Sequence, residues 1–232
     1  MSKGTGKQSG RGGQRDLSVR VRSAKGRKTS STLWLQRQLN DPYVKMAKRD
    51  GYRSRAAYKL LELDDKYQLL KPGMRVLDLG AAPGGWTQVA ADRVKAADDK
   101  GWVLGVDILP MQPVPHATLI ELDFMAEDAP QRIREALGGL ADIVLSDMAP
   151  NTTGHAATDH IRILAMVEAA CLFATEVLKP GGAFICKVRQ GGMEGMLLTQ
   201  LRQRFTKATH AKPKASRSGS AETFLVATGF KG

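Results

Sequence analysis

The feature that most constrains the fold of this chain is a short apolar strand that runs into a cluster of glycines and then into a helix. Residues 74–79 form the strand, residues 80–85 the cluster Gly80-Ala81-Ala82-Pro83-Gly84-Gly85, and residues from Trp86 to about Val94 the helix. Glycines allow a tight turn and let the backbone approach a ligand closely. The sequence therefore predicts a doubly wound sheet with a ligand at the carboxyl end of its first strand.

The rest of the chain repeats the alternation of strand and helix. A helix that Ser54 caps is predicted to end before Lys71-Pro72-Gly73, and another to stop at Lys179-Pro180-Gly181-Gly182. Further strands are expected at 101–107, 118–123, 141–147 and 183–188, and further helices near 130–137, 158–178 and 193–205. The strands near 206–211 and 222–229 have no helix between them, which favours an antiparallel hairpin. We therefore predict an α/β, Rossmann-like fold with a seven-stranded, mostly parallel sheet.

Basic residues are concentrated near the start of the sequence. Residues 1–40 hold ten Lys and Arg and one acid, which is +9 of the formal net charge of +12. The first thirty residues are rich in Gly, Ser and Gln, a composition that buries too little apolar surface to fold. We predict a disordered basic tail over 1–40 that attracts phosphate, and a catalytic domain over 41–232. A merely solubilising extension is the alternative, and a mitochondrial presequence ranks lower.

Other sequence features exclude several classes of protein. Cys171 and Cys186 have no ligand-like spacing, which argues against a disulfide scaffold or a cysteine zinc site. No apolar run reaches the roughly 18 residues that a membrane span needs, and no secretory signal is visible. The expected location is the cytoplasm.

Acidic residues at the ends of the predicted strands indicate the ligand. Asp107 ends the second strand, 27 residues after Gly80, where a carboxylate can accept the two hydroxyls of a ribose. Asp78 would repel a pyrophosphate but could hold the ammonium of a methionine moiety. This combination favours S-adenosylmethionine over NAD, whereas glycines that serve only a tight turn are the structural alternative.

Two further residues near this loop have two interpretations each. Asp123 could accept the amino group of an adenine at the end of the third strand, although such an acid more often ends a strand in a turn. Trp86 could pack in the core or form a wall of the cofactor pocket, and the sequence does not distinguish the two.

Three charged residues are expected to converge at the same edge of the sheet. Asp147 ends the fourth strand, Lys187 lies within the apolar fifth strand, and Glu222 opens the last strand. A lysine in such a run is unusual because a buried ammonium is costly unless it is paired or neutralised. Adjacent strands lie about 4.8 Å apart, so these side chains could meet if the last strand lies beside the fifth. The spacing does not single out Lys59, since an exposed helical lysine is the ordinary interpretation.

Four ordered motifs are present in the chain: Ser54-Arg55-Ala56-Ala57-Tyr58-Lys59-Leu60, the segment 78–86, Ser146-Asp147-Met148-Ala149-Pro150-Asn151, and Lys187-Val188 followed by Gln190-Gly191. Together they resemble the motifs of the FtsJ/RrmJ family of S-adenosylmethionine-dependent RNA ribose 2′-O-methyltransferases. The resemblance covers about residues 40–232. Two departures are Arg189, where an apolar or aromatic residue is expected, and a lengthened loop over 96–100.

The resemblance implies a substrate and a set of functional residues. It implies methylation of a uridine in large-subunit ribosomal RNA. We also expect a monomer, and no metal, since methyl transfer develops no phosphate charge that a metal would have to clamp. The implied catalytic residues are Lys59, Asp147, Lys187 and Glu222. The implied contacts to S-adenosylmethionine are Gly84, Trp86, Asp107, Asp123 and Asp147.

The expected reaction is in-line transfer of the sulfonium methyl group to a ribose 2′-oxygen. Lys187 is the candidate general base, Asp147 orients it, and Lys59 and Glu222 position the ribose and Lys187. Alternatively, Lys187 only orients the hydroxyl while its proton leaves late. The rival functions are methylation of transfer RNA, an inactive RNA-binding ribosome-assembly factor, and an NAD-dependent oxidoreductase.

Overall fold

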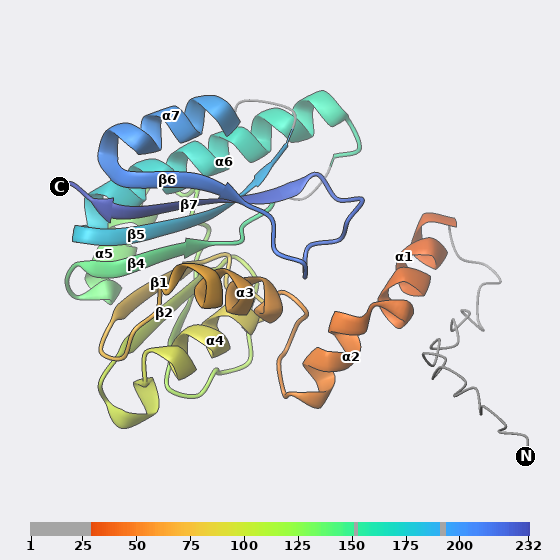
Figure 1. Ribbon diagram of the computed structural model, residues 1–232, viewed down its shortest axis with the longest axis horizontal. Coiled ribbons are helices and arrows are strands. Elements are labelled where there is room, and N and C mark those ends of the chain that lie inside the picture. Colours follow the sequence, from red (N-terminus) through yellow and green to blue (C-terminus); the bar gives the residue numbers. More distant parts are fainter. Residues whose placement is uncertain (1–28, 151–152, 191–193) are drawn as a thin grey trace, which may run out of the picture.

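The computed structural model describes residues 29–150, 153–190 and 194–232, and these form one sheet with helices on both faces (Figure 1). The strands are β1 (Arg75–Leu79), β2 (Trp102–Asp107), β3 (Thr118–Glu121), β4 (Ala141–Ser146), β5 (Leu178–Arg189), β6 (Phe205–Ala211) and β7 (Glu222–Phe230). Their order in the sheet is β3-β2-β1-β4-β5-β7-β6, with β7 antiparallel to both of its neighbours and the other pairings parallel. The predicted seven-stranded, mostly parallel sheet with its antiparallel hairpin is confirmed.

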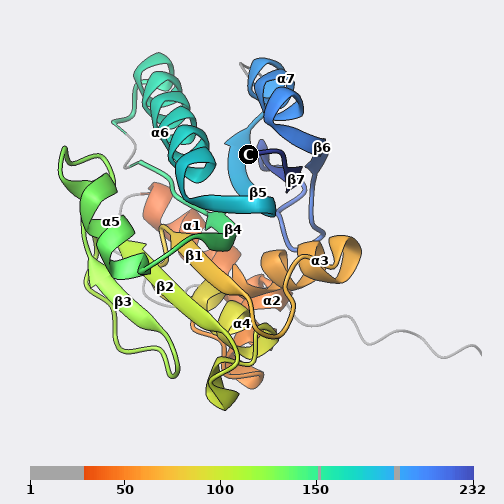
Figure 2. The ribbon, with the colours of Figure 1, turned by 90° about the vertical axis from the view of Figure 1, so that its left-hand side faces the viewer.

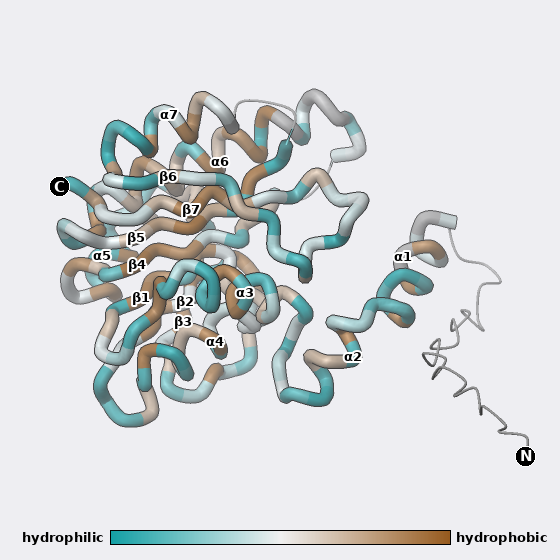
Figure 3. The backbone as a smooth tube through the Cα atoms, in the orientation of Figure 1, coloured by the Kyte–Doolittle hydropathy of each residue, from teal (hydrophilic) through white to brown (hydrophobic). Residues whose placement is uncertain are grey.

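The helices divide between the two faces of the sheet (Figure 2). One face carries α5 (Ala129–Leu137), α6 (Ala156–Val177) and α7 (Glu194–Arg204), and the other carries α3 (Ala57–Tyr67) and α4 (Gly85–Arg93). A short 3-10 helix, η1 (Ala96–Asp98), follows α4 and accounts for part of the lengthened loop. Because both faces are covered, the central strands are apolar almost throughout, as Figure 3 shows.

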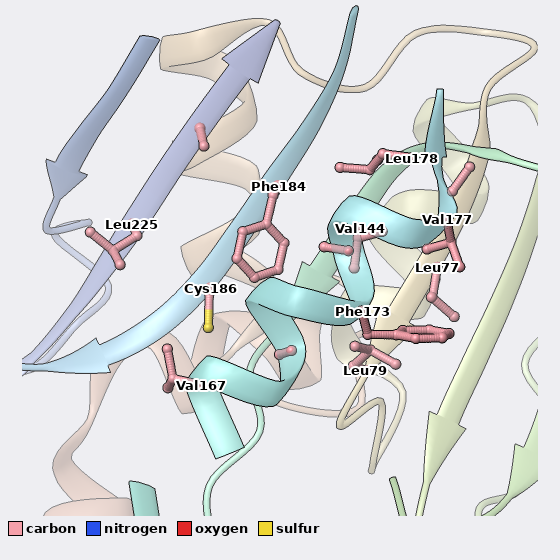
Figure 4. Close-up of a cluster of buried hydrophobic side chains, with 14 of the residues drawn as sticks. Leu77, Leu79, Val144, Val167, Phe173, Val177, Leu178, Phe184, Cys186 and Leu225 are labelled. Carbon is pink, nitrogen blue, oxygen red and sulfur yellow. The ribbon is translucent and has the colours of Figure 1, made fainter. Parts of the chain in front are cut away.

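Two apolar cores fix the position of each strand. Figure 4 shows the core under α6, where Phe173 and Val177 point at Leu77 and Leu79 of β1. The core on the other face joins α3 and α4 to the sheet and includes the fully buried Phe224 of β7. A fully buried side chain of this size stabilises the fold by about 1.5–3 kcal/mol, so the register of β1, β4, β5 and β7 is firmly set.

Three details of the predicted elements were wrong. Helix α3 begins at Ala57 with Ala56 as its N-cap, and no side chain caps it, so Ser54 lies in the turn before the helix. The segment Lys179–Gly182 is part of the start of β5, where only residues 179–181 are exposed, because Leu178 already pairs with Ala141 and the register then shifts. Strand β3 ends at Glu121, and Asp123 lies beyond it.

The predicted tail is partly helical. Residues 1–28 lie outside the described part of the chain, but residues 29–40 form helix α1 (Thr29–Asn40), so the prediction of disorder was wrong for them. The glycines that favour disorder stop before residue 29, and the sequence of α1 contains neither Gly nor Pro. Helix α2 (Pro42–Arg49) follows at once, with Asp41 as its N-cap. Among the described residues, no helix is long and apolar enough to cross a membrane.

Candidate active site

The carboxyl ends of β4 and β5 and the start of β7 meet at one edge of the sheet. Asp147 follows β4 directly, and its backbone amide donates to Leu79 O at the end of β1 (3.2 Å). Lys187 lies near the end of β5 opposite Phe224, and Glu222 at the start of β7 lies opposite Arg189. The antiparallel insertion of β7 beside β5 thus brings Glu222 to the edge where the parallel strands end.

Four charged side chains form an alternating chain at this edge. Lys59 Nζ donates to Glu222 Oε2 (2.8 Å) and lies 3.9 Å from Asp147 Oδ2. Lys187 Nζ lies 3.1 Å from Asp147 Oδ1 and donates to the backbone oxygen of Asp147 (2.5 Å). Two ammonium groups therefore alternate with two carboxylates, which compensates for the cost of removing these partly buried charges from water.

Lys59 is the member of this set that spacing alone missed. Helix α3 lies flat against the sheet, and Lys59 is only 7% exposed, with its Nζ 5.7 Å from the centre of the Phe224 ring. Tyr58 and Leu60 on either side of Lys59 are also buried. The sequence alone does not distinguish Lys59 from an exposed helical lysine. Only the family resemblance indicates Lys59 as a site residue.

Glu222 is held in its ionised form. Burial alone would raise its pKa, but the charge of Lys59 and hydrogen bonds from Lys59 and Ser216 outweigh burial and leave the pKa lowered. The Ser216 hydroxyl donates to Glu222 Oε1 at 2.8 Å. Ser216 was not among the predicted site residues, since a serine in a polar loop gives no signal in the sequence.

The glycine cluster forms the turn between β1 and α4. Gly80 has φ +78°, and a Cβ atom there would lie 2.8 Å from the Cα atom of Met148, next to Asp147. Gly84 has φ +110° and is the N-cap of α4, where a Cβ would lie 2.9 Å from Val114 Cγ2. Only glycine fits both positions without displacing its neighbours, so the loop backbone approaches the ends of β1 and β4 closely.

Asp107 at the end of β2 is bound to this loop. Its Oδ2 atom accepts from the backbone amide of Ala82 (2.9 Å), and its Oδ1 atom accepts from that of Leu109 (2.8 Å). Each carboxylate oxygen can accept a second hydrogen bond, and the side chain is only half-buried. The carboxylate is therefore fixed in orientation with acceptor capacity left over.

Asp78 is fully buried near the carboxyl end of β1, which is a central strand of the sheet. Its Oδ2 atom accepts from the Thr87 hydroxyl (2.7 Å), whereas its Oδ1 atom has no hydrogen-bond partner. Burial, followed by the nearby charges of Asp147 and Asp107, raises the pKa of Asp78 to about 7, although the hydrogen bond from Thr87 acts in the opposite direction. An uncompensated buried carboxylate attracts a cation at this edge.

Trp86 and Asp123 have different surroundings. Trp86 is 3% exposed, its indole N–H donates to Ala56 O (2.8 Å), and its ring packs against Phe224 at 5.6 Å. It is therefore a core residue, and its contact with a cofactor stays a prediction. Asp123 is exposed and its Oδ1 atom accepts from the amide of Met125 (2.9 Å), the turn arrangement that the sequence offered as an alternative.

A cavity of about 410 Å³ opens beside these four charged side chains. Its wall includes Lys187, Arg189 and Glu222 together with the apolar Met148 and Ile163. Arg189, which departs from the expected apolar residue, is exposed at this wall. The cavity therefore has both apolar and charged lining residues.

Comparisons with known proteins show which proteins this chain is similar to. A ribosomal RNA large subunit methyltransferase E from Paramagnetospirillum magneticum is 63% identical over 95% of this chain and 91% of its own length. One of the same name from Roseobacter denitrificans is 57% identical over 100% of this chain and 99% of its own. A crystal structure assigned as a ribosomal RNA methyltransferase from Plasmodium falciparum has 32% identity and a TM-score of 0.69, covering 78% of this chain and 100% of that one.

The comparison with protein families settles the question of membership. The model of the FtsJ-like methyltransferases matches residues 52–230, which span α3, α4 and the whole sheet with the four charged residues described above. The resemblance that the motifs indicated is confirmed: this chain belongs to the family of FtsJ-like methyltransferases.

Proposed function

We propose that this protein methylates the ribose 2′-hydroxyl of a uridine in large-subunit, 23S-type ribosomal RNA, with S-adenosylmethionine as donor and Lys187 as general base. The observation that carries the proposal is the series of paired charges Glu222–Lys59–Asp147–Lys187 beside a cavity of about 410 Å³. Membership of the methyltransferase family supports the reaction class, and the names of the relatives support the substrate. We further propose that the protein acts as a cytoplasmic monomer on RNA within the large subunit.

The residues at the loop fit S-adenosylmethionine. The spare acceptor capacity of Asp107 suits the two hydroxyls of its ribose, and Gly84 allows the backbone to approach it. The unpaired oxygen of Asp78 supplies negative charge for its methionine ammonium. We keep Trp86, Asp123 and Asp147 as proposed further contacts. When bound, this cofactor supplies an electrophilic methyl group.

The contacts of Lys187 define its proposed role. Its Nζ atom donates to the backbone oxygen of Asp147 and forms an ion pair with the Asp147 carboxylate. These two contacts hold the amine at the wall of the cavity, where it could meet a substrate hydroxyl. In the neutral form, the amine can take the proton of the 2′-hydroxyl as that oxygen becomes a nucleophile. Lys59, held by Glu222 and Asp147, then positions the ribose and balances the charge of Asp147.

Cofactor binding should depend on pH through Asp78. The ammonium of the ligand favours the ionised carboxylate of Asp78. Because the pKa of Asp78 is about 7, binding at lower pH releases a proton, and the affinity rises with pH until about pH 7. Below that, the affinity for S-adenosylhomocysteine should fall by up to about tenfold per pH unit, as titration calorimetry can measure. Asp78→Asn should bind with little pH dependence over the same range, and an unchanged slope would remove Asp78 from this role.

Asp107→Ala should weaken the binding of S-adenosylhomocysteine by about 10- to 100-fold, because hydrogen bonds to a charged acceptor contribute about 1.5–3 kcal/mol. The matched control is Glu121→Ala, since Glu121 lies opposite Asp107 in the register of β2 and β3 and is exposed. Calorimetry on both variants measures the effect. Equal dissociation constants for Asp107→Ala and the wild-type protein would contradict the assignment.

Transfer of tritiated methyl groups tests the function itself. The protein is incubated with labelled S-adenosylmethionine and either large ribosomal subunits, naked ribosomal RNA or bulk transfer RNA, and the labelled nucleosides are identified. We expect label in 2′-O-methyluridine from the large subunit. Label confined to transfer RNA would overturn the proposed substrate, and binding of the cofactor without any transfer would favour an inactive assembly factor.

A further inference from the structure

A second hollow lies beside the candidate active site. It is about 810 Å³ in volume and lies between the helices α1 and α2 and the loop of residues 212–221 that joins β6 to β7. We call it the basic groove, because its lining includes Arg37, Arg55, Lys212, Lys214 and Arg217 and the single acid Asp41. Its first wall precedes residue 52 and so lies outside the part of the chain that the family model matches.

Asp41 holds the two walls of the groove together. Its Oδ1 atom caps α2 by accepting from the amide of Tyr43 (3.1 Å). Its Oδ2 atom lies 3.0 Å from Arg55 Nε and 3.2 Å from Arg217 Nη2, so it joins α2 to the turn before α3 and to the 212–221 loop. Arg55 also donates to the backbone oxygen of Ala215. The groove is therefore a built feature with fixed walls.

The charge of the groove indicates a polyanionic ligand. Arg55 and Arg217 share Asp41, whereas Arg37 and Lys214 are exposed and make no ion pair within the described part of the chain. Five cations against one acid leave an excess of positive charge along the groove. Spaced cations of this kind match a sugar–phosphate backbone, which carries one negative charge per nucleotide.

The basic groove leads to the proposed site of reaction. Ser216 lines the groove, and its hydroxyl donates to Glu222, while residues 219–222 of the same stretch line the 410 Å³ cavity with Lys187. The groove and the cavity thus lie on two sides of one loop. RNA bound in the groove would therefore lie beside the loop that also lines the cavity.

We propose that the basic groove binds the sugar–phosphate backbone of RNA nucleotides that flank the methylated one. This inference rests on the proposed function for the identity of the nucleic acid. It gives α1 and α2 a role in binding the substrate, and it gives the 212–221 loop a role in coupling that binding to Glu222. In the sequence, nine Lys and Arg of residues 1–28 precede α1.

The test compares two charge-reversed forms of the full chain. Arg37→Glu with Lys214→Glu changes the groove, and Lys71→Glu with Lys207→Glu changes two exposed lysines near the opposite edge of the sheet by the same total charge. Binding to a 23S ribosomal RNA transcript is measured over a series of salt concentrations. We expect the groove variant to bind at least about tenfold more weakly, with a salt dependence lower by about two counterions. The control should resemble the wild type.

The outcomes separate this inference from the proposed function. Equal RNA affinities for the two variants would contradict RNA binding in the groove, because the change in net charge alone would then explain any loss of affinity. Methyl transfer is measured in parallel, and calorimetry with S-adenosylhomocysteine checks that both variants are folded. If the groove variant bound RNA more weakly but the wild-type protein transferred no methyl group, the result would support the groove and contradict the proposed function. Normal methyl transfer with an unchanged KM for RNA in the groove variant would do the reverse.

Discussion

Lys187→Ala should lower kcat for methyl transfer by about 10²- to 10⁴-fold, the range that a positioned general base contributes. The amine that would accept the hydroxyl proton is lost, while the loop of residues 80–85 that we propose for the cofactor keeps its own contacts. The dissociation constant of S-adenosylhomocysteine should therefore stay within about twofold of the wild-type value, far less than the about 1.4 kcal/mol of a tenfold change. Lys179→Ala, at the exposed start of the same strand, is the matched control for the reaction.

A second substitution distinguishes a base from an orienting group. In Lys187→Arg, the guanidinium keeps a positive charge and can still donate to Asp147, but it does not lose a proton at any accessible pH. If Lys187 is the base, single-turnover rates of the arginine and alanine variants should be similarly low. A rate for Lys187→Arg close to that of the wild type would contradict the base and leave Lys187 as the residue that orients the hydroxyl.

Gly80→Ala should combine a large loss of stability with a loss of activity. The residue has φ +78°, which costs an alanine about 1–2 kcal/mol. The new methyl group would also lie 2.8 Å from Met148 Cα and 2.9 Å from Met148 N, which are backbone atoms that yield only if the end of β4 moves. Relieving that overlap adds about 1–3 kcal/mol and displaces the neighbouring Asp147.

Gly51→Ala is a close control for this effect. Gly51 has the same φ of +78°, but a Cβ atom there would have no neighbour within 4 Å. Urea unfolding should therefore show the strain of the left-handed backbone alone in Gly51→Ala, and a clearly greater loss of stability in Gly80→Ala. If the two variants lost the same free energy of unfolding and both kept wild-type turnover, the close contact between the glycine loop and β4 would have no energetic importance.

The sequence was sufficient for the sheet because its signals are local and repeated. Each central strand is an apolar run bounded by Gly, Pro or an acid, and Asp107 and Asp147 directly follow or end such runs. Helix α1 was missed because the Gly-rich stretch before Thr29 dominated the composition of the region. The start of β5 was missed because Pro180 and two glycines normally end regular structure, whereas here the register shift accommodates them.

The candidate site could be predicted only in part, because its remaining contacts are long-range. Asp147, Lys187 and Glu222 could be predicted because the ends of parallel strands and the start of an antiparallel neighbour meet at one edge of a sheet. The structure brings the three residues together there. Lys59 reaches them from a helix that local periodicity describes as amphipathic, so nothing in its spacing indicates a contact with Glu222, 163 positions away. The same holds for Asp41, which meets Arg217 across the groove. Such pairings exist only once the tertiary fold has formed.

The insertion of β7 between β5 and β6 has a consequence for biosynthesis. An interior strand of the sheet comes from residues 222–230, after every other strand has been translated. A nascent chain that stops before Glu222 therefore leaves two facing strand edges without partners and lacks one carboxylate of the charged chain. In such a fragment, β5 and β6 lack the strand that joins them, and the site is incomplete. Premature termination therefore gives an inactive, aggregation-prone product. Completion of translation is in this way built into the requirement for activity.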